Sequence, residues 1–383
     1  MEVVVAGRHL TGSAVVALDV SGREHLVLVA KATWSIPGPG ERPRPLPPEP
    51  LAVADDFAGE PGQSALLYGT DLARFKPRCD VLFNACAHSP HGQPVNELLV
   101  AWQVGPLRKG LRVVGPRIWR KRLGLVSLSR PEPFTRMPLH YGLAFGGSRT
   151  YRTGRGDQAR ELTEACLANP DGIGWFGKHT VGDIDGAPAP CLEAPDDPVM
   201  QPNGRHKPQA FSAIARHWEP RRQYAGTYDE AWQKNVFPFL PEDFDERFHQ
   251  CAPEDQQMDY PGGGEPVVLR HLVAGRDHVQ FRLPALDTVQ FRVLRKDYST
   301  EMPQPVVDTL YFEPDAGRFS AVWRASVPIR RRLHEFAAIA IGPVDLAWWE
   351  AMQAGQAGGC VGCSGPRAAD TEADDEDAEE EDA

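Results

Sequence analysis

The sequence lacks an apolar run long enough to cross a membrane. Its longest apolar-leaning stretch, "FAAIAIGPVDLAWW", has 14 residues and carries Asp345, whereas a membrane-spanning helix needs about 20 apolar residues. The start, "MEVVVAGRHLTG", has no basic residues ahead of a long apolar core and no small-residue cleavage pattern, so it does not resemble a secretory signal. We therefore expect a cytoplasmic protein without membrane insertion.

Cysteine is scarce, with seven residues in 383, an odd number at wide spacings. This pattern favours reduced thiols over a disulfide framework. One C-x-x-C pair, Cys360 and Cys363, lies in "GQAGGCVGCSGP", and a single pair supplies half of a tetrahedral zinc site. The pair is a weak metal candidate, and an unstructured pair, an intermolecular contact or a redox role are the alternatives. No cofactor and no metal site are predicted.

Common catalytic fingerprints are also absent: the sequence has no nucleophile elbow, phosphate-binding loop, dinucleotide fingerprint or H-E-x-x-H pair. The acidic residues Asp55, Asp56 and Glu60 could serve acid–base catalysis. Because no second catalytic group can be identified beside them, a structural role is favoured. We therefore predict a protein that is not an enzyme, with a carboxylate-dependent hydrolase as the alternative.

Negative charge is concentrated in one short segment. Ten of the thirteen residues from Asp370 to Asp382 are acidic, and leaving them out changes the balance from 41 basic and 52 acidic residues to 41 and 42. A block of like charges without large apolar residues cannot bury enough surface to fold. We expect a disordered tail that solubilises the protein or attracts a basic partner. The scattered basic residues of a balanced body argue against nucleic-acid binding.

The composition of the rest is that of a loop-rich β protein. The 36 glycines and 36 prolines interrupt helices, and alternating stretches such as "HLVLVAKATWSI" and "FSAVWRASVPI" are typical of strands. The short strands are not separated by helices of crossover length, which favours antiparallel pairing. The predicted fold is mainly β, with sandwich- or barrel-like antiparallel sheets, a long irregular middle segment and few short helices. We expect such helices at residues 157–168 and 227–236.

Changes of pattern divide the chain into four regions. They are a β-rich N-terminal region (1–130), an irregular aromatic-rich middle segment (131–262), a β-rich C-terminal region (263–350), and a Gly/Cys linker with the acidic tail (351–383). The sequence leaves open whether the two β-rich regions form one body or two.

Charged residues interrupt an apolar, proline-bounded stretch, "GEPGQSALLYGTDLARFKPRCD". Buried charges persist only when they are paired and hydrogen-bonded. We therefore predict a structural knot of charged side chains, in which Asp71 or Asp80 pairs with a basic residue. Its predicted members are Glu60, Asp71, Lys76, Arg78 and Asp80.

The same stretch carries a family resemblance. Together with "EPFTRMPLHYGLAFGG", "FPFLPEDFDERFHQCAPEDQQ" and "GGEPVVLRHL", it resembles a bacterial family of formerly uncharacterised domains encoded beside type VI secretion spike and effector genes. The resemblance covers most of residues 1–345. It implies an adaptor or chaperone that binds a type VI effector protein and helps to load it onto the spike-tip protein. It implies no catalytic residues. An immunity-like protein that blocks a toxin is a further alternative.

Eight aromatic residues crowd the stretch from Trp218 to Phe248. Rings can pack an irregular backbone internally, and they also dominate partner surfaces. We favour internal packing for most of them, and a client-binding surface is the alternative. The rings expected to be buried are Trp218, Trp232, Phe237 and Phe239. The candidate partner-binding residues are Arg222, Tyr224, Tyr228 and Trp232.

Overall fold

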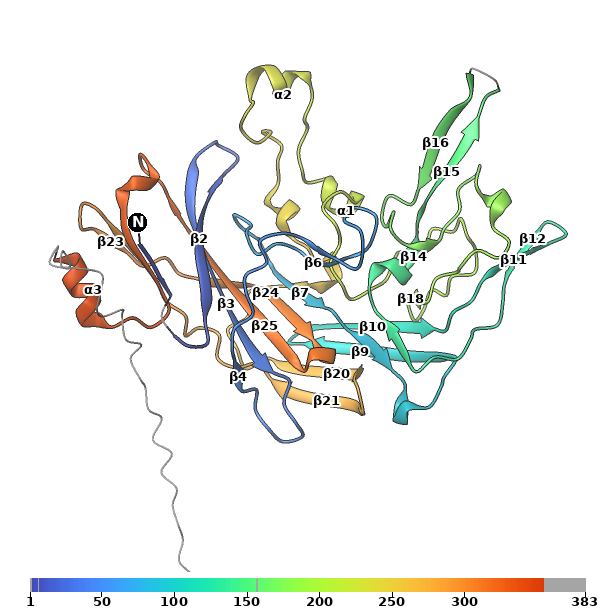
Figure 1. Ribbon diagram of the computed structural model, residues 1–383, viewed down its shortest axis with the longest axis horizontal. Helices are drawn as coiled ribbons and strands as arrows, with labels where there is room; N and C mark the ends of the chain where they lie inside the picture. The colour runs from blue at the N-terminus through green and yellow to red at the C-terminus, as the bar shows by residue number, and fades with distance from the viewer. Residues whose placement is uncertain (1, 6, 156–157, 355–383) are drawn as a thin grey trace, which may run out of the picture.

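The computed structural model of the protein describes residues 2–5, 7–155 and 158–354, and it confirms a mainly β fold built largely from antiparallel sheets (Figure 1). The largest sheet has seven strands, in the order β19-β7-β24-β25-β3-β2 with β4 beside β3. These strands are Gln257–Met258 (β19), Cys79–Phe83 (β7), Val306–Glu313 (β24), Arg318–Pro328 (β25), Glu24–Ser35 (β3), Thr11–Leu18 (β2) and Pro45–Leu46 (β4).

A second sheet has five strands in the order β18-β10-β9-β20-β21. They are Leu192–Glu193 (β18), Leu107–Val114 (β10), Glu97–Val104 (β9), Pro266–Val273 (β20) and Arg276–Arg282 (β21). Both sheets combine strands from early and late parts of the chain, since β3 pairs with β25 and β9 pairs with β20. The two β-rich regions therefore share their sheets.

The main core lies between these two sheets and is tied together by contacting rings. Phe83 of β7 stacks on Trp102 of β9 at a centroid distance of 5.0 Å and on Phe312 of β24 at 4.8 Å. Phe319 of β25 continues the row at 5.4 Å from Phe312. Phe83, Phe312 and Phe319 lie on adjacent strands of the seven-stranded sheet, and Trp102 meets them from the five-stranded sheet. Large rings bury much apolar area, so the row contributes to the packing between the sheets.

Smaller sheets surround this sandwich. A four-stranded sheet contains Glu2–Val5 (β1), Phe336–Ile341 (β26), Phe291–Arg295 (β22) and Thr300–Glu301 (β23). Two-stranded pairs are Trp119–Arg122 (β11) with Leu125–Leu128 (β12), Cys86–His88 (β8) with Arg136–Pro138 (β13), Phe145–Gly146 (β14) with Ile173–Gly174 (β17), Ser148–Thr153 (β15) with Arg160–Ala165 (β16), and Asp56–Phe57 (β5) with Leu66–Tyr68 (β6).

The α-helices of the described chain are short: Glu219–Arg222 (α1), Glu230–Asn235 (α2) and Leu346–Gln353 (α3). The helix expected at 227–236 is present as α2, and its N-cap is Asp229, whose side chain accepts from Trp232 N–H at 2.8 Å. The prediction of a helix at 157–168 is wrong, because residues 160–165 of this stretch form β16 and pair with β15. Pairing with a neighbouring strand outweighs helix propensity there. None of the described helices is long and apolar enough to cross a membrane.

The ring row provides a test of the core. Phe312 is fully buried between Phe83 and Phe319, so Phe312→Ala should lower the free energy of unfolding by about 3–5 kcal/mol. The matched control is Leu123→Ala, at a side chain that is fully exposed. Chemical denaturation should find Leu123→Ala unchanged, and an equal loss in the two variants would contradict this view of the core.

Candidate functional site

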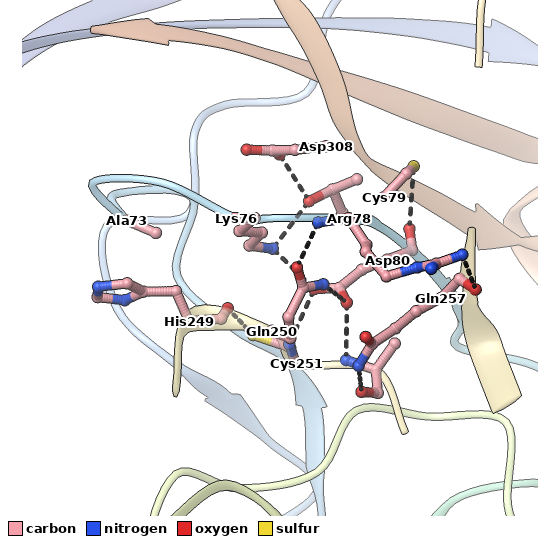
Figure 2. A network of polar contacts seen from close by, with 12 residues as sticks. Ala73, Lys76, Arg78, Cys79, Asp80, His249, Gln250, Cys251, Gln257 and Asp308 are labelled. Carbon is pink, nitrogen blue, oxygen red and sulfur yellow. Dashed lines mark hydrogen bonds and ion pairs between the residues drawn. The ribbon is translucent and has the colours of Figure 1, made fainter. Parts of the chain in front are cut away.

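The carboxylate of Asp80 is fully buried in β7, next to β19, the strand that the middle segment adds at the edge of the seven-stranded sheet. It accepts hydrogen bonds from Lys76 Nζ (3.0 Å), Gln250 Nε2 (2.5 Å) and the backbone N–H groups of Cys251 (2.8 Å) and Ala252 (3.2 Å). Figure 2 shows Lys76, Gln250 and Cys251 converging on Asp80. These donors replace the water that the carboxylate loses on burial.

Lys76 joins this carboxylate to the neighbouring strand, since its Nζ also donates to Thr309 Oγ1 in β24 at 2.9 Å. Burial is the largest single influence and would lower the pKa of Lys76, but the charges of Asp80 and Asp308 and the Cys251 sulfur together raise the pKa above its ordinary value. Lys76 therefore stays protonated at neutral pH, and the ion pair with Asp80 is retained.

Two further buried ion pairs extend across the sheet. Asp71 accepts hydrogen bonds from Lys31 Nζ in β3 (3.2 Å) and from the backbone N–H of Ala52 (2.7 Å). Arg324 in β25 binds Asp308 in β24 and donates to the carbonyl oxygen of Asp71 (2.8 Å). The loop that carries Asp71 is thereby attached to the adjacent strands β3 and β25, and Arg324 links it to Asp308 in β24. We call this set the buried polar network; its members are Lys31, Asp71, Lys76, Asp80, Asp308 and Arg324.

Asp71 and Asp80 each pair with a buried lysine, as the sequence predicts, but two predicted members of the knot lie outside the network. The guanidinium of Arg78 is half exposed and lies 3.3 Å from the exposed carboxylate of Asp259. Glu60 is exposed in the turn that follows β5. Both side chains reach solvent, so neither needs a buried counter-charge.

Three members of the network were not predicted: Lys31, Asp308 and Arg324. Two of them had a signal in the sequence, because Lys31 in "LVAKATW" and Arg324 in "AVWRASV" are lone basic residues in alternating apolar strands. A lone charge in such a strand requires a buried partner. No comparable signal singles out Asp308.

Residues 250–252, which donate hydrogen bonds to Asp80, belong to a segment that also lines a groove of about 530 Å³. Gln250 and Ala252 contribute to it from this segment, and Leu167, Pro220 and Tyr224 contribute from the chain around β16 and α1. A largely apolar groove with a few polar groups is the usual form of a binding site. The network thus positions part of the lining of a candidate binding groove.

Arg221 attaches α1 to the groove. Its guanidinium is buried and donates to the carbonyl oxygens of Ile214 (2.9 Å) and Phe248 (2.8 and 3.0 Å). Phe248 lies in the 3₁₀ turn Glu246–His249, directly before the residues that bind Asp80. The short segment 248–252 is therefore held at both ends by buried hydrogen bonds, to Arg221 at Phe248 and to Asp80 at Cys251 and Ala252.

An aromatic arm, which we define as residues 226–241, stands out from the body beside the groove and carries α2 (Figure 1). Trp232 is its centre: the ring lies 4.7 Å from Tyr228 and 5.7 Å from Phe237, and its Nε1 donates to the carbonyl oxygen of Phe239 at 2.9 Å. At the start of the arm, Thr227 donates to Asp243, just beyond the end of the arm, from both its N–H (2.9 Å) and its hydroxyl (2.7 Å). Three rings of the arm, Tyr228, Trp232 and Phe237, therefore form one contacting group.

The prediction of buried rings is confirmed for Trp218 and wrong for the arm. Trp218 is fully buried, whereas Phe237 is 66% exposed and Phe239 is 45% exposed. Trp232 is half-buried. Tyr228, Trp232 and Phe237 pack on one another, and the ring of Phe239 lies against Gly22 in the turn between β2 and β3. These contacts leave Phe237 and Phe239 largely exposed because the arm projects from the body.

The candidate partner-binding residues occupy two neighbouring places. Tyr228, 55% exposed, and Trp232 contact each other in the arm. Tyr224 lines the groove and is half-buried under the guanidinium of Arg247, which lies 4.2 Å from the ring centroid. Arg222 is exposed on α1. A second projection, the β15–β16 hairpin, stands out on the same side of the body as the arm (Figure 1).

Of the acidic residues considered for catalysis, Asp55 is engaged in an ion pair with Arg216. Burial would raise the pKa of Asp55, but the paired guanidinium of Arg216, at 2.8 and 2.9 Å, lowers it below its usual range. A general acid needs the opposite shift. Within the described ranges, no group of three His, Cys, Asp or Glu side chains could hold a metal ion. Cys360, Cys363 and the acidic tail lie outside the described residues.

Residues 21–324 match a family described as "Uncharacterized protein conserved in bacteria (DUF2169)". The chain belongs to this DUF2169 family. The match spans the buried polar network, the groove and the aromatic arm, so these features lie within the family region. No curated protein matches the chain, and no solved structure matches it.

The first test of the site concerns Asp80. Asp80→Ala leaves Lys76 buried without a counter-charge and should lower the free energy of unfolding by about 3–5 kcal/mol. Asp259→Ala is the matched control, because that carboxylate is exposed in its pair with Arg78 and should contribute about 1 kcal/mol or less. Chemical denaturation of both variants measures the difference, and equal effects would argue against a structural role for Asp80.

The second test uses His249, which neighbours the network. Burial and the cations Arg221 and Arg324 lower the pKa of His249 to about 3. Below an unfolded-state pKa of about 6.5, the unfolded chain binds a proton that the folded protein does not bind. Stability is therefore lost as the pH falls, by up to about 1.4 kcal/mol per pH unit.

His249→Gln should remove this part of the pH dependence between about pH 6.5 and 4, as measured by denaturant unfolding at a series of pH values. The exposed His91 provides the control, and His91→Gln should keep the slope of the unmodified protein. A slope that His249→Gln leaves unchanged would show that His249 titrates normally in the folded state.

Proposed function

We propose that the protein is a non-enzymatic cytoplasmic adaptor that binds a type VI secretion effector and passes it to the spike-tip protein. The observation that carries the proposal is the aromatic arm. It exposes Tyr228, Phe237 and Phe239 beside a largely apolar groove that Tyr224 lines. The sequence resemblance to domains encoded beside spike and effector genes supports the choice of partner.

The chemistry of the arm suits a protein partner. Aromatic side chains bury large areas at low cost in side-chain entropy, and they are frequent among the residues that dominate protein interfaces. Three exposed rings on one arm form a larger apolar surface than scattered single residues would. The partner that fits is a polypeptide segment that lays apolar side chains against the arm and reaches into the groove.

The groove and the arm contribute differently to binding: the groove offers a fixed shape, and the arm offers exposed rings. The groove is held by Asp80 and Arg221, so its shape is set before the partner arrives, which lowers the entropy lost on binding. Release needs no chemical step: a spike protein that binds the effector more tightly can displace the adaptor by mass action.

The proposal is tested by co-purifying the tagged protein with the effector encoded beside its gene. The double substitution Tyr228→Ser with Phe237→Ser should weaken capture by about tenfold or more while the melting temperature stays within a few degrees. The control, Leu123→Ser with Leu125→Ser, changes two apolar side chains on the β11–β12 hairpin that are more exposed than those of the arm, and it should leave capture unchanged.

Two results would contradict the proposal. Capture that survives the arm substitutions, or that falls equally in the hairpin control, would remove the arm from the interface.

Deletion of the gene should also abolish effector delivery and leave the producing cells viable. Poisoning of sibling cells would instead indicate an immunity protein.

A further inference from the structure

A cluster of basic side chains lies in the turn between β25 and β26. We call it the arginine turn; its members are Arg330, Arg331 and Arg332, and all three are exposed. Arg330 pairs with Glu301 at 3.0 Å and lies 3.9 Å from Asp297. The side chains of Arg331 and Arg332 have no carboxylate partner in the part of the chain that the structure describes.

The nearby carboxylates are already engaged. Glu335 pairs with the buried Arg295 and accepts the backbone N–H groups of Arg330 (2.9 Å) and Arg331 (3.0 Å). Glu301 is shared between Arg295 and Arg330, each at 3.0 Å. The guanidinium groups of the turn are permanently charged, so the turn keeps an excess of positive charge at every physiological pH.

The described chain ends beside this turn. Trp349 packs α3 onto the four-stranded sheet, against Leu294 and Ala338. Gln353, the last residue of α3, donates to Thr300 Oγ1 at 2.6 Å. Thr300 precedes Glu301, the residue that binds Arg330. The polypeptide therefore leaves α3 within a few residues' reach of the arginine turn.

The sequence beyond this point carries the complementary charge. Fifteen residues, 355–369, separate α3 and Ala354 from the acidic segment 370–382, in which ten of thirteen residues are Asp or Glu. Fifteen residues span at most about 50 Å. A segment tethered this closely has an effective concentration in the millimolar range.

We propose that the acidic segment 370–382 binds the arginine turn of its own chain and acts as a built-in competitor against other polyanions. The β11–β12 hairpin also exposes arginines, Arg120 and Arg122, but it lies at the opposite end of the molecule from α3 (Figure 1). Charge complementarity and the position of Gln353 both favour the arginine turn. This inference goes beyond the adaptor function and does not depend on it.

The contact can be tested on the full chain by zero-length carbodiimide cross-linking, which joins a lysine amine to a carboxylate that it touches. Lys296 is exposed beside the turn, where its backbone N–H donates to the carbonyl oxygen of Glu335 at 2.7 Å. We expect a Lys296 cross-link to residues 370–382 within single molecules. Its yield should fall by about threefold or more in 0.5 M salt and in the variant Arg331→Glu with Arg332→Glu.

The β11–β12 hairpin supplies the matched controls. Arg120→Glu with Arg122→Glu should leave the Lys296 cross-link unchanged. A cross-link that forms mainly at Lys121 of this hairpin, that joins separate molecules, or that is absent at Lys296 in low salt would overturn the proposal.

A second measurement follows the competition itself, with a fluorescent single-stranded oligonucleotide as the polyanion. Replacing the ten acidic residues of 370–382 by Asn and Gln should strengthen binding by about tenfold at low salt. Adding Arg331→Glu with Arg332→Glu should cancel most of the gain, whereas adding Arg120→Glu with Arg122→Glu should cancel little of it. An equal loss in both combinations would mean that the segment acts through net charge alone, and the proposal would fail.

Discussion

The structure depends on one buried carboxylate. Asp80 accepts four hydrogen bonds, and three of the donors belong to residues about 170 positions later in the chain. A carboxylate in this position is costly to bury unless all its donors are present. The contact acts in both directions, because the charged carboxylate of Asp80 in turn helps to hold the donors at 250–252 in place. The middle segment is therefore attached to the sandwich by polar contacts as well as by apolar packing.

This attachment relates the scaffold to the candidate binding surface. The sheets meet across a row of rings from Phe83 to Phe319, and the buried polar network lies across the same strands and fixes the loops above them. Gln250 and Ala252 face both Asp80 and the groove. The aromatic arm differs from this core, since Tyr228, Phe237 and Phe239 stay exposed. Rigid support and an exposed aromatic surface are what a binding protein requires.

Sequence patterns predicted part of this arrangement. Alternation in "HLVLVAKATWSI" and "FSAVWRASVPI" predicted strands, and these became β3 and β25. Charges in an apolar stretch predicted that Asp71 or Asp80 pairs with a basic residue, because a buried charge requires a partner. The partners Asp308 and Gln250 could not be identified, since pairing across such distances depends on which strands become neighbours. The exposure of Phe237 and Phe239 was missed for a related reason. The sequence shows that the segment is rich in aromatic residues, but it does not show whether other parts of the fold cover their rings.

The most direct test of this account is hydrogen exchange of the backbone amides in Asp80→Asn, which keeps the shape of the side chain and removes its charge. The account predicts that the amides of Cys251 and Ala252 and the rest of segment 246–258 lose protection, while β3 and β25 keep theirs. Unchanged protection at Cys251 and Ala252 would contradict it, and so would an equal loss over the whole sheet, because either result would mean that Asp80 does not specifically hold the middle segment in place.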